Sequence, residues 1–166
     1  ILKLANEVVF PVTARGGGVG YTGGAVPVEG GIVIGTDRMK QIIEINVDDL
    51  YITCQPGLTT FEVQQAAAEV GLMFAPDPAS YKDSYIGGNI AENAGGMRTP
   101  KYGVTKHHVL GLEVVTAQGD IIRTGGRTVK NVVGFDLTGL MCGSEGMLGI
   151  ITEATLSFLG VGLPPS

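Results

Sequence analysis

The sequence predicts an α+β fold, and two observations support this prediction. Short runs rich in β-branched residues and separated by turn residues predict strands over residues 31–35, 41–45 and 51–55. The next segment, residues 59–70, instead repeats apolar side chains at helical spacing, and further strand-like runs follow it. Strands and helices therefore come in mixed order, without the regular alternation that is typical of a doubly wound sheet.

The first expected elements lie ahead of these strands. The chain starts without Met, and its first six residues are typical of the interior of a helix. We therefore expect a piece of a longer protein, truncated at its N-terminus. A short apolar run over residues 8–13 predicts a strand, and it leads into Arg15-Gly-Gly-Gly-Val-Gly-Tyr-Thr-Gly-Gly24, in which six of ten residues are glycine.

The helix over residues 59–70 has recognisable ends. Thr59 and Glu62 have the spacing of a capping box at its start. Gly71 is a natural stop, because glycine readily adopts the left-handed conformation that ends many helices. The expected buried face consists of Val63, Ala66, Ala67 and Val70.

The second half of the chain predicts a long loop and then more strands. Residues 76–103 carry turn residues with little periodicity, and a loop of this length within a compact domain is usually functional. A hairpin follows over residues 109–117 and 120–123. We expect a short helix over residues 135–141, capped by Asp136. The last strand spans residues 147–158, with Gly149 at a bulge or at a close approach of two backbones.

Composition limits the possible functions. The chain has 166 residues, enough for one domain or two small lobes, and 27 of them are glycine, far above the usual share of about 7%. Only 16% of the residues are charged, so we expect another part of a protein to cover some of the surface. The net charge of −5 argues against a nucleic-acid partner, because phosphate backbones require basic patches.

Several kinds of site and segment are not expected. No apolar run approaches the roughly 18 residues of a membrane span, and the first residues do not lead us to expect a signal peptide. We expect a cytoplasmic protein, and peripheral attachment to a membrane stays open. Cys54 and Cys142 lie far apart in apolar surroundings, without the spacing of a metal site, and are expected to be buried free thiols.

The glycine-rich stretch after residue 14 predicts an anion site made of backbone N–H groups. Its letters from Gly18 to Gly23 match the dinucleotide fingerprint G-x-G-x-x-G, which requires a helix opening at the third glycine. Pro27 and the pair Gly30-Gly31 disfavour such a helix, and no Gly-Lys-Ser/Thr completes a P-loop. A glycine-rich turn that binds nothing stays open as an alternative.

Two further glycine-rich segments, residues 87–96 and 143–149, widen this prediction. Three backbone-lined segments suit a large ligand with many polar atoms, such as a dinucleotide. The chain resembles the PCMH-type FAD-binding domain of the vanillyl-alcohol oxidase/p-cresol methylhydroxylase superfamily, nearest to the glycolate oxidase FAD-binding subunit and D-lactate dehydrogenase. The resemblance is carried by Pro11-Val-Thr-Ala-Arg-Gly-Gly-Gly18, Ile86-Gly-Gly-Asn-Ile-Ala-Glu-Asn-Ala-Gly-Gly96, Lys101-Tyr-Gly-Val104, Val109-Leu-Gly-Leu-Glu-Val-Val115, Lys130-Asn-Val-Val-Gly-Phe-Asp136 and Gly143-Ser-Glu-Gly-Met-Leu-Gly-Ile-Ile-Thr152.

The resemblance implies two small α+β lobes with FAD between them, and it implies which residues contact the cofactor. They are Arg15, Gly16, Gly17, Gly18, Val19 and Gly20 at the diphosphate; Pro76, Asp77 and Ser80 in the next stretch; Gly87, Gly88, Ala91, Asn93, Gly95 and Gly96 beside diphosphate and flavin; Tyr102 and Gly103 near the flavin; and Glu145, Gly146, Gly149, Ile150 and Ile151 near the adenosine half.

The resemblance also implies the reaction, oxidation of a 2-hydroxy acid of the glycolate or D-lactate type by hydride transfer to flavin N5. Catalytic residues are expected on a cap domain that would begin near Pro164, so this chain by itself is not expected to turn over substrate. An iron–sulfur subunit or another protein would accept the electrons. An ether-lipid synthase, a sugar-lactone oxidase and a flavin-binding fragment without turnover stay open as alternatives.

Three positions are ambiguous. Relatives with a covalent flavin place a histidine where this chain has Val19, which predicts non-covalent FAD. His107 and His108 are expected at a surface or strand edge, where adjacent side chains point to opposite faces and cannot bind one metal together. A flavin-proximal role for them stays open. Arg98 either lies in solvent or faces the flavin or a substrate carboxylate.

Overall fold

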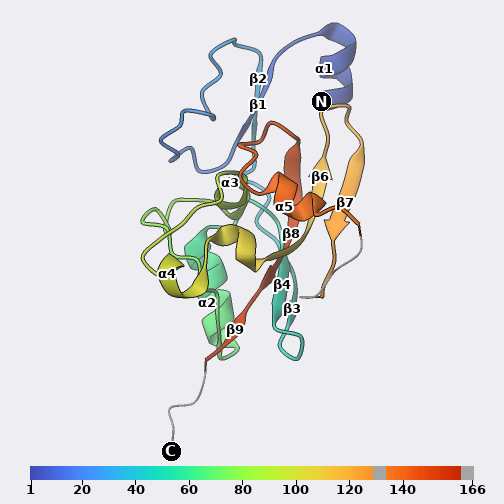
Figure 1. The fold of residues 1–166 in the computed structure, drawn as a ribbon. Coiled ribbons are helices and arrows are strands. Elements are labelled where there is room, and N and C mark those ends of the chain that lie inside the picture. Colours follow the sequence, from blue (N-terminus) through green and yellow to red (C-terminus); the bar gives the residue numbers. More distant parts are fainter. Residues whose placement is uncertain (129–133, 162–166) are drawn as a thin grey trace, which may run out of the picture.

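The computed structural model describes residues 1–128 and 134–161, and it confirms the α+β prediction (Figure 1). The expected start of the cap domain near Pro164 lies outside these ranges. So do the first four residues of the family motif that runs from Lys130 to Asp136. The elements are α1 (Leu2–Val8), β1 (Val12–Arg15), β2 (Ile32–Gly35), β3 (Ile42–Asn46), β4 (Tyr51–Cys54), α2 (Thr60–Glu69), β5 (Leu72–Met73), α3 (Ile86–Ala91), α4 (Thr99–Tyr102), the 3₁₀ turn η1 (Thr105–His108), β6 (Val109–Val115), β7 (Ile121–Gly125), α5 (Leu137–Met141), β8 (Ile150–Ser157) and β9 (Leu159–Gly160).

The centre of the fold is a five-stranded antiparallel sheet in the order β3-β4-β8-β6-β7. Helices α2 and α4 lie beside this sheet, and the small β1–β2 pair lies at one end of the molecule (Figure 1). Alternate residues of the central strands, such as Ile52 on β4 and Leu156 on β8, are fully buried in the main hydrophobic cluster. The strands predicted before the helix agree with β2, β3 and β4 to within one residue at each end.

Helix α2 forms as the sequence predicts. The Thr59 hydroxyl accepts from the Glu62 amide at 3.1 Å, and the Glu62 carboxylate accepts from the Thr59 amide at 2.6 Å, which completes the capping box. Of the expected apolar face, Val63, Ala66 and Ala67 are buried. Gly71 follows the helix with φ +74°.

The β1–β2 pair is a separate, parallel two-stranded sheet. Residues 16–31 connect its strands, and they contain no helix, as expected from Pro27 and the paired glycines. Most of this connection is exposed to solvent. The G-x-G-x-x-G letters are therefore part of a loop between two strands, and the prediction against a dinucleotide-type helix is confirmed.

Two predictions were wrong. Residues 8–13 do not form one strand, because α1 continues to Val8, Val9 is left-handed with φ 58°, and β1 begins only at Val12. The expected loop over residues 76–103 contains α3 and α4. In α3, burial of the i, i+4 pair Ile86 and Ile90 stabilises a helix that its two glycines conceal in the sequence.

The remaining elements follow the predictions, except that the last long strand, β8, begins at Ile150 and not at residue 147. The β6–β7 hairpin turns at Gly119, and Asp136 caps α5 by accepting from the Gly139 amide at 2.7 Å. Gly149 lies just before β8, where an added Cβ would be 2.7 Å from the Val115 carbonyl oxygen, so the expected close approach is present. Cys54 and Cys142 are buried free thiols, and burial raises the pKa of Cys54 to about 12.

Candidate functional site

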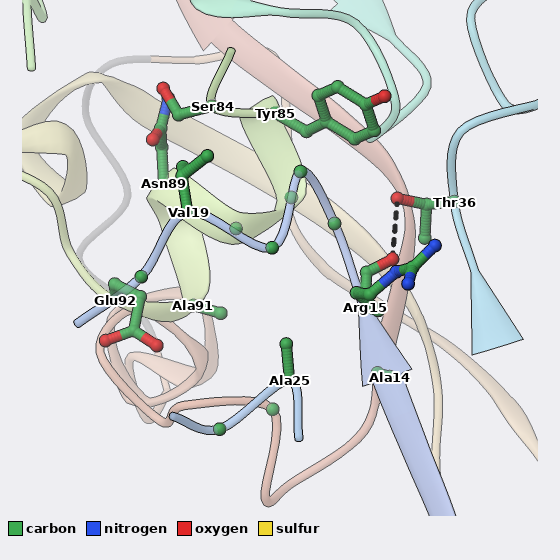
Figure 2. Close-up of a pocket in the computed structure, with 18 of the residues that line it drawn as sticks. Ala14, Arg15, Val19, Ala25, Thr36, Ser84, Tyr85, Asn89, Ala91 and Glu92 are labelled. Carbon is green, nitrogen blue, oxygen red and sulfur yellow. Dashed lines mark hydrogen bonds between the residues drawn. The ribbon is translucent and has the colours of Figure 1, made fainter. Parts of the chain in front are cut away.

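The described chain encloses one large cavity of about 340 Å³ between the β1–β2 unit and the sheet. Three stretches line it: residues 14–25, residues 80–94 and residues 145–151. Figure 2 shows the loop after Arg15 crossing in front of α3, with Arg15 and Thr36 at one end and Glu92 at the other. The three glycine-rich segments of the sequence thus meet at a single place.

Most of the predicted site residues line this cavity. They are Arg15, Gly16, Gly17, Gly18, Val19, Gly20, Ser80, Gly87, Gly88, Ala91, Glu145, Gly146, Gly149, Ile150 and Ile151.

The loop wall offers hydrogen-bond donors that the described protein does not use. From Gly16 to Gly20, no backbone N–H donates to an acceptor within residues 1–128 and 134–161. The Gly88 amide likewise has no acceptor in that part of the chain. Unpaired amides that face a cavity are suited to an anion with several oxygens, such as a diphosphate.

Glycine serves two purposes in these walls. An added Cβ at Gly17 would clash with the Asp83 carbonyl oxygen, and one at Gly87 would lie 2.7 Å from Pro56 Cβ, so close packing requires glycine there. At Gly88 and Gly146, by contrast, an added Cβ would meet no atom within 4 Å. At these two positions a side chain would extend into the open cavity.

The charged side chains of the cavity are few. Among its described lining residues Arg15 is the single cation, and Glu92 and Glu145 are the anions. The Thr22 hydroxyl donates to the Glu92 carboxylate at 3.3 Å, which ties the far end of the loop to the end of α3. An anionic ligand would therefore be held mainly by backbone dipoles and by Arg15.

The comparison with protein families shows which family the chain belongs to and which cofactor that family binds. The model of a family described as FAD binding domain matches residues 1–125. The chain belongs to this family of FAD-binding domains. FAD is its cofactor.

Relatives agree with this assignment. The domain is 51% identical over 159 residues to the glycolate oxidase subunit GlcD of Bacillus subtilis, covering 96% of this chain and 34% of that protein. It is 47% identical over 156 residues to D-lactate dehydrogenase of Archaeoglobus fulgidus (94% and 35%), and 41% identical over 156 residues to D-2-hydroxyglutarate dehydrogenase of Stutzerimonas stutzeri (94% and 34%). The chain thus spans about a third of the length of these relatives.

A solved structure supports the fold. Alkyldihydroxyacetonephosphate synthase superimposes on 98% of this chain and 32% of its own, with a TM-score of 0.82 and 27% sequence identity. The expectation of a PCMH-type FAD-binding fold is confirmed.

The cavity of the FAD-binding domain fits this cofactor. Free amides and missing Cβ atoms leave room for a diphosphate at the glycine loop, and Ala14, Ile150 and Ile151 provide apolar wall for rings. The lining residues that sequence reasoning missed are Ala14, Tyr21, Thr22, Gly24, Ala25, Thr36, Pro56, Ser84, Tyr85, Asn89, Glu92 and Ala94. Thr36 and Pro56 follow β2 and β4, and only the folded chain brings them to the loop.

Seven predicted residues do not line the cavity. Asp77 accepts from the Arg98 amide at 3.0 Å and pairs with its guanidinium at 3.5 Å, so Arg98 binds a protein carboxylate. The Asn93 side chain accepts from the Lys106 amide at 2.9 Å. The full set is Pro76, Asp77, Asn93, Gly95, Gly96, Tyr102 and Gly103.

One of the two histidines differs from expectation, since His107 is exposed as expected and His108 is buried. They lie in η1 and not on a strand, and His108 is only 4% exposed. The His108 Nε2 atom lies 2.9 Å from the Tyr102 carbonyl oxygen, and its ring packs edge-on against Phe74 at 6.2 Å. His107 is exposed and accepts from the Val104 amide through Nδ1. Neither histidine lines the cavity.

Two further searches cover the described residues. Within residues 1–128 and 134–161, no group of three or more His, Cys, Asp or Glu side chains is placed to hold a metal ion. In the same ranges, no helix has the length and apolar character needed to cross a bilayer.

Proposed function

We propose that this domain is the cofactor-binding part of an FAD-linked oxidoreductase that oxidises a small 2-hydroxy acid to the 2-keto acid. The observation that carries the proposal is the cavity with its free amides, found in a chain whose relatives are named after glycolate, D-lactate and D-2-hydroxyglutarate. All three named compounds carry a hydroxyl group on the carbon next to a carboxylate. We infer that this shared unit is what the whole protein acts on.

The chain's own residues bind and orient the cofactor. The amides from Gly16 to Gly20 and the Arg15 side chain face the cavity and supply donors and positive charge for the diphosphate. The apolar side chains of Ile150 and Ile151 limit access of water to the bound rings. The chemistry that FAD supplies when bound is acceptance of a hydride from the substrate carbon.

We further propose that FAD is held without a covalent bond. The described residues lining the cavity include no histidine and no cysteine, while the phenols of Tyr21 and Tyr85 are nucleophilic side chains that do line it. The proposal therefore rests on Val19. Val19 lines the cavity at the position where relatives with a covalent flavin have histidine. Denaturation in acid or in SDS should therefore release all the flavin into solution. Flavin that stays with the denatured chain would contradict this proposal.

The substrate groups are proposed to lie outside this chain. The domain spans about a third of its relatives, and the described cavity walls contain no histidine that could act as a base. A cap domain of the same longer protein would supply the substrate-binding and catalytic side chains. An iron–sulfur subunit or another protein would take up the electrons.

The test uses the full-length protein that contains this chain. Purified without denaturation, it should show the absorption bands of oxidised flavin. Anaerobic addition of glycolate, D-lactate or D-2-hydroxyglutarate should bleach the visible band, and L-lactate serves as the stereochemical control. Absence of flavin from a folded preparation that also fails to bind added FAD would contradict the cofactor assignment.

The second candidate function is an ether-lipid synthase, which the structural similarity to alkyldihydroxyacetonephosphate synthase favours. Bound flavin that no 2-hydroxy acid bleaches would favour this candidate, or a flavin-binding protein without turnover. Conversion of an acyl-dihydroxyacetonephosphate with a fatty alcohol would separate these two.

A further inference from the structure

A buried polar network lies behind the cavity wall formed by residues 80–92. It consists of Thr60, the first residue of α2, together with Ser84 and Asn89. Thr60 is 0% exposed, and Ser84 and Asn89 are each 5% exposed. Ser84 and Asn89 line the cavity (Figure 2). Thr60 is not among the lining residues. Buried polar groups are costly unless they are hydrogen-bonded, so the directions of these bonds are informative.

The network has a direction that follows from its donors. The Asn89 side-chain NH₂ can only donate, and it donates to the Thr60 hydroxyl oxygen. The second partner of that hydroxyl within the described chain is Ser84 Oγ at 3.4 Å. Either hydroxyl could donate in this pair, but the Thr60 proton has no other acceptor within the described chain and Thr60 is fully buried. Donation from Thr60 to Ser84 is therefore the direction that leaves no buried proton unpaired. Ser84 thus accepts from Thr60, and its own proton is free for another acceptor.

Ser84 lies beside the glycine loop, whose amides are unpaired in the described chain. Gly17 packs against this segment, because an added Cβ there would clash with the Asp83 carbonyl oxygen and lie 3.6 Å from Ser84 Cα. Ser84 and the glycines of the loop thus line the same cavity. Donors that converge in this way are suited to a phosphate oxygen.

The start of α2 holds this network in place. The Thr60 amide donates to the Ser84 carbonyl at 3.1 Å, and the Phe61 amide donates to the Tyr81 carbonyl at 2.9 Å. The capping box of Thr59 fixes the same helix end. The start of α2 therefore contacts Ser84 through both its backbone carbonyl and its side chain.

We propose that Thr60 is a positioning residue for the cofactor: with Asn89 as its donor, it turns the Ser84 hydroxyl proton toward a diphosphate oxygen of FAD. This inference rests on the proposed binding of FAD in the cavity. If the inference is correct, Thr60 affects the affinity for FAD only through Ser84, because Thr60 itself does not line the cavity.

The experiment is a double-mutant cycle in the full-length protein, with the affinity of the apoprotein for FAD measured by flavin fluorescence. Ser84→Ala should weaken binding about ten- to a hundredfold, as expected for loss of a hydrogen bond to a charged group. Thr60→Val should weaken it in the same direction, and Thr60→Ser, which keeps the hydroxyl, should restore it. The double variant Thr60→Val/Ser84→Ala should bind FAD as Ser84→Ala does. Unfolding of each apoprotein is measured alongside.

Two probes test the assignment to the diphosphate. ADP contains a diphosphate and should lose affinity for Ser84→Ala, whereas riboflavin contains none and should not. The positioning role would be overturned if Thr60→Val and Thr60→Ser lost the same amount of FAD affinity. It would also be overturned if the losses of FAD affinity for Thr60→Val and Ser84→Ala multiplied in the double variant. If Thr60→Val does not fold, unchanged FAD affinity of Ser84→Ala would still overturn it. Wild-type apoprotein that takes up no FAD would instead contradict the proposed function.

Discussion

The two walls of the cavity are built in different ways. The wall formed by residues 80–92 is part of the core, since Ile86 and Ile90 are buried and the start of α2 binds its carbonyl groups. The loop of residues 16–31 is mostly exposed. Within the described chain, one side-chain hydrogen bond joins this loop to the rest of the protein, from the Thr22 hydroxyl to the Glu92 carboxylate. One wall is therefore ordered by folding, whereas the other keeps its amides free for the ligand.

The largest expected effect comes from the ordered wall. Ile90→Ala removes a fully buried side chain from the main cluster and should lower the free energy of unfolding by about 2–5 kcal/mol. Val28→Ala, at an 84% exposed position of the loop, is the control and should change it by less than about 0.5 kcal/mol. Urea unfolding of the apoprotein measures both values. Similar losses at the two positions would show that the walls do not differ as described.

The second effect concerns the place where the loop packs on the ordered wall. Gly17→Ala forces a Cβ against the Asp83 carbonyl oxygen, which should move the loop away from Ser84. We expect a loss of about 1–3 kcal/mol in FAD-binding free energy and a smaller loss in unfolding free energy. Gly126→Ala is the control, since its Cβ would meet no atom within 4 Å. FAD titration together with thermal unfolding separates the two quantities.

Sequence reasoning succeeded where local chemistry determines the structure. The capping box at Thr59, the Asp136 cap and the hairpin turn at Gly119 each depend on a few neighbouring residues. The three glycine-rich segments that line the cavity could be predicted because a high density of glycine is a local signal for exposed backbone. Most of the predicted cofactor residues accordingly line the cavity.

Sequence reasoning failed where tertiary contacts decide. Helix α3 contains Gly87 and Gly88, which disfavour a helix, and only burial of its isoleucines stabilises it. Thr60 lies next to the cavity wall because α2 packs there, so its place in the polar network could not be predicted. Asp77 and Asn93 match the family pattern, but their side chains bind Arg98 and Lys106 backbone groups.

A third prediction concerns how the stability of the fold depends on pH through the buried side chain of His108. Burial, the main cause, lowers the pKa of His108 below its ordinary value of about 6.5, although its hydrogen bond to the Tyr102 carbonyl opposes the shift. The unfolded chain then binds a proton as the pH falls through about 6.5, whereas the folded chain binds it only at a lower pH, so acid should destabilise the fold. The loss is about 1.4 kcal/mol for each unit of pKa lowering.

The matching variant is His108→Phe, which keeps a ring against Phe74 and removes the titrating group. It should be less stable near pH 8, because the Tyr102 carbonyl loses its donor, and it should lose less stability than wild type between pH 7 and pH 5. Unfolding free energies at several pH values in one buffer series measure both slopes. Identical slopes would mean that another group causes the acid sensitivity.

The smallest effect separates ligand binding from stability within one helix. Gly88 lies inside α3, where glycine costs about 0.5–1 kcal/mol relative to alanine, and an added Cβ would meet no protein atom within 4 Å. Gly88→Ala should therefore stabilise the apoprotein by about that amount and weaken FAD binding, because the methyl group extends into the cavity. Gly87→Ala is the matched control, since its Cβ would lie 2.7 Å from Pro56 Cβ and should destabilise the fold. A Gly88→Ala protein that binds FAD as wild type does would place the cofactor away from this wall.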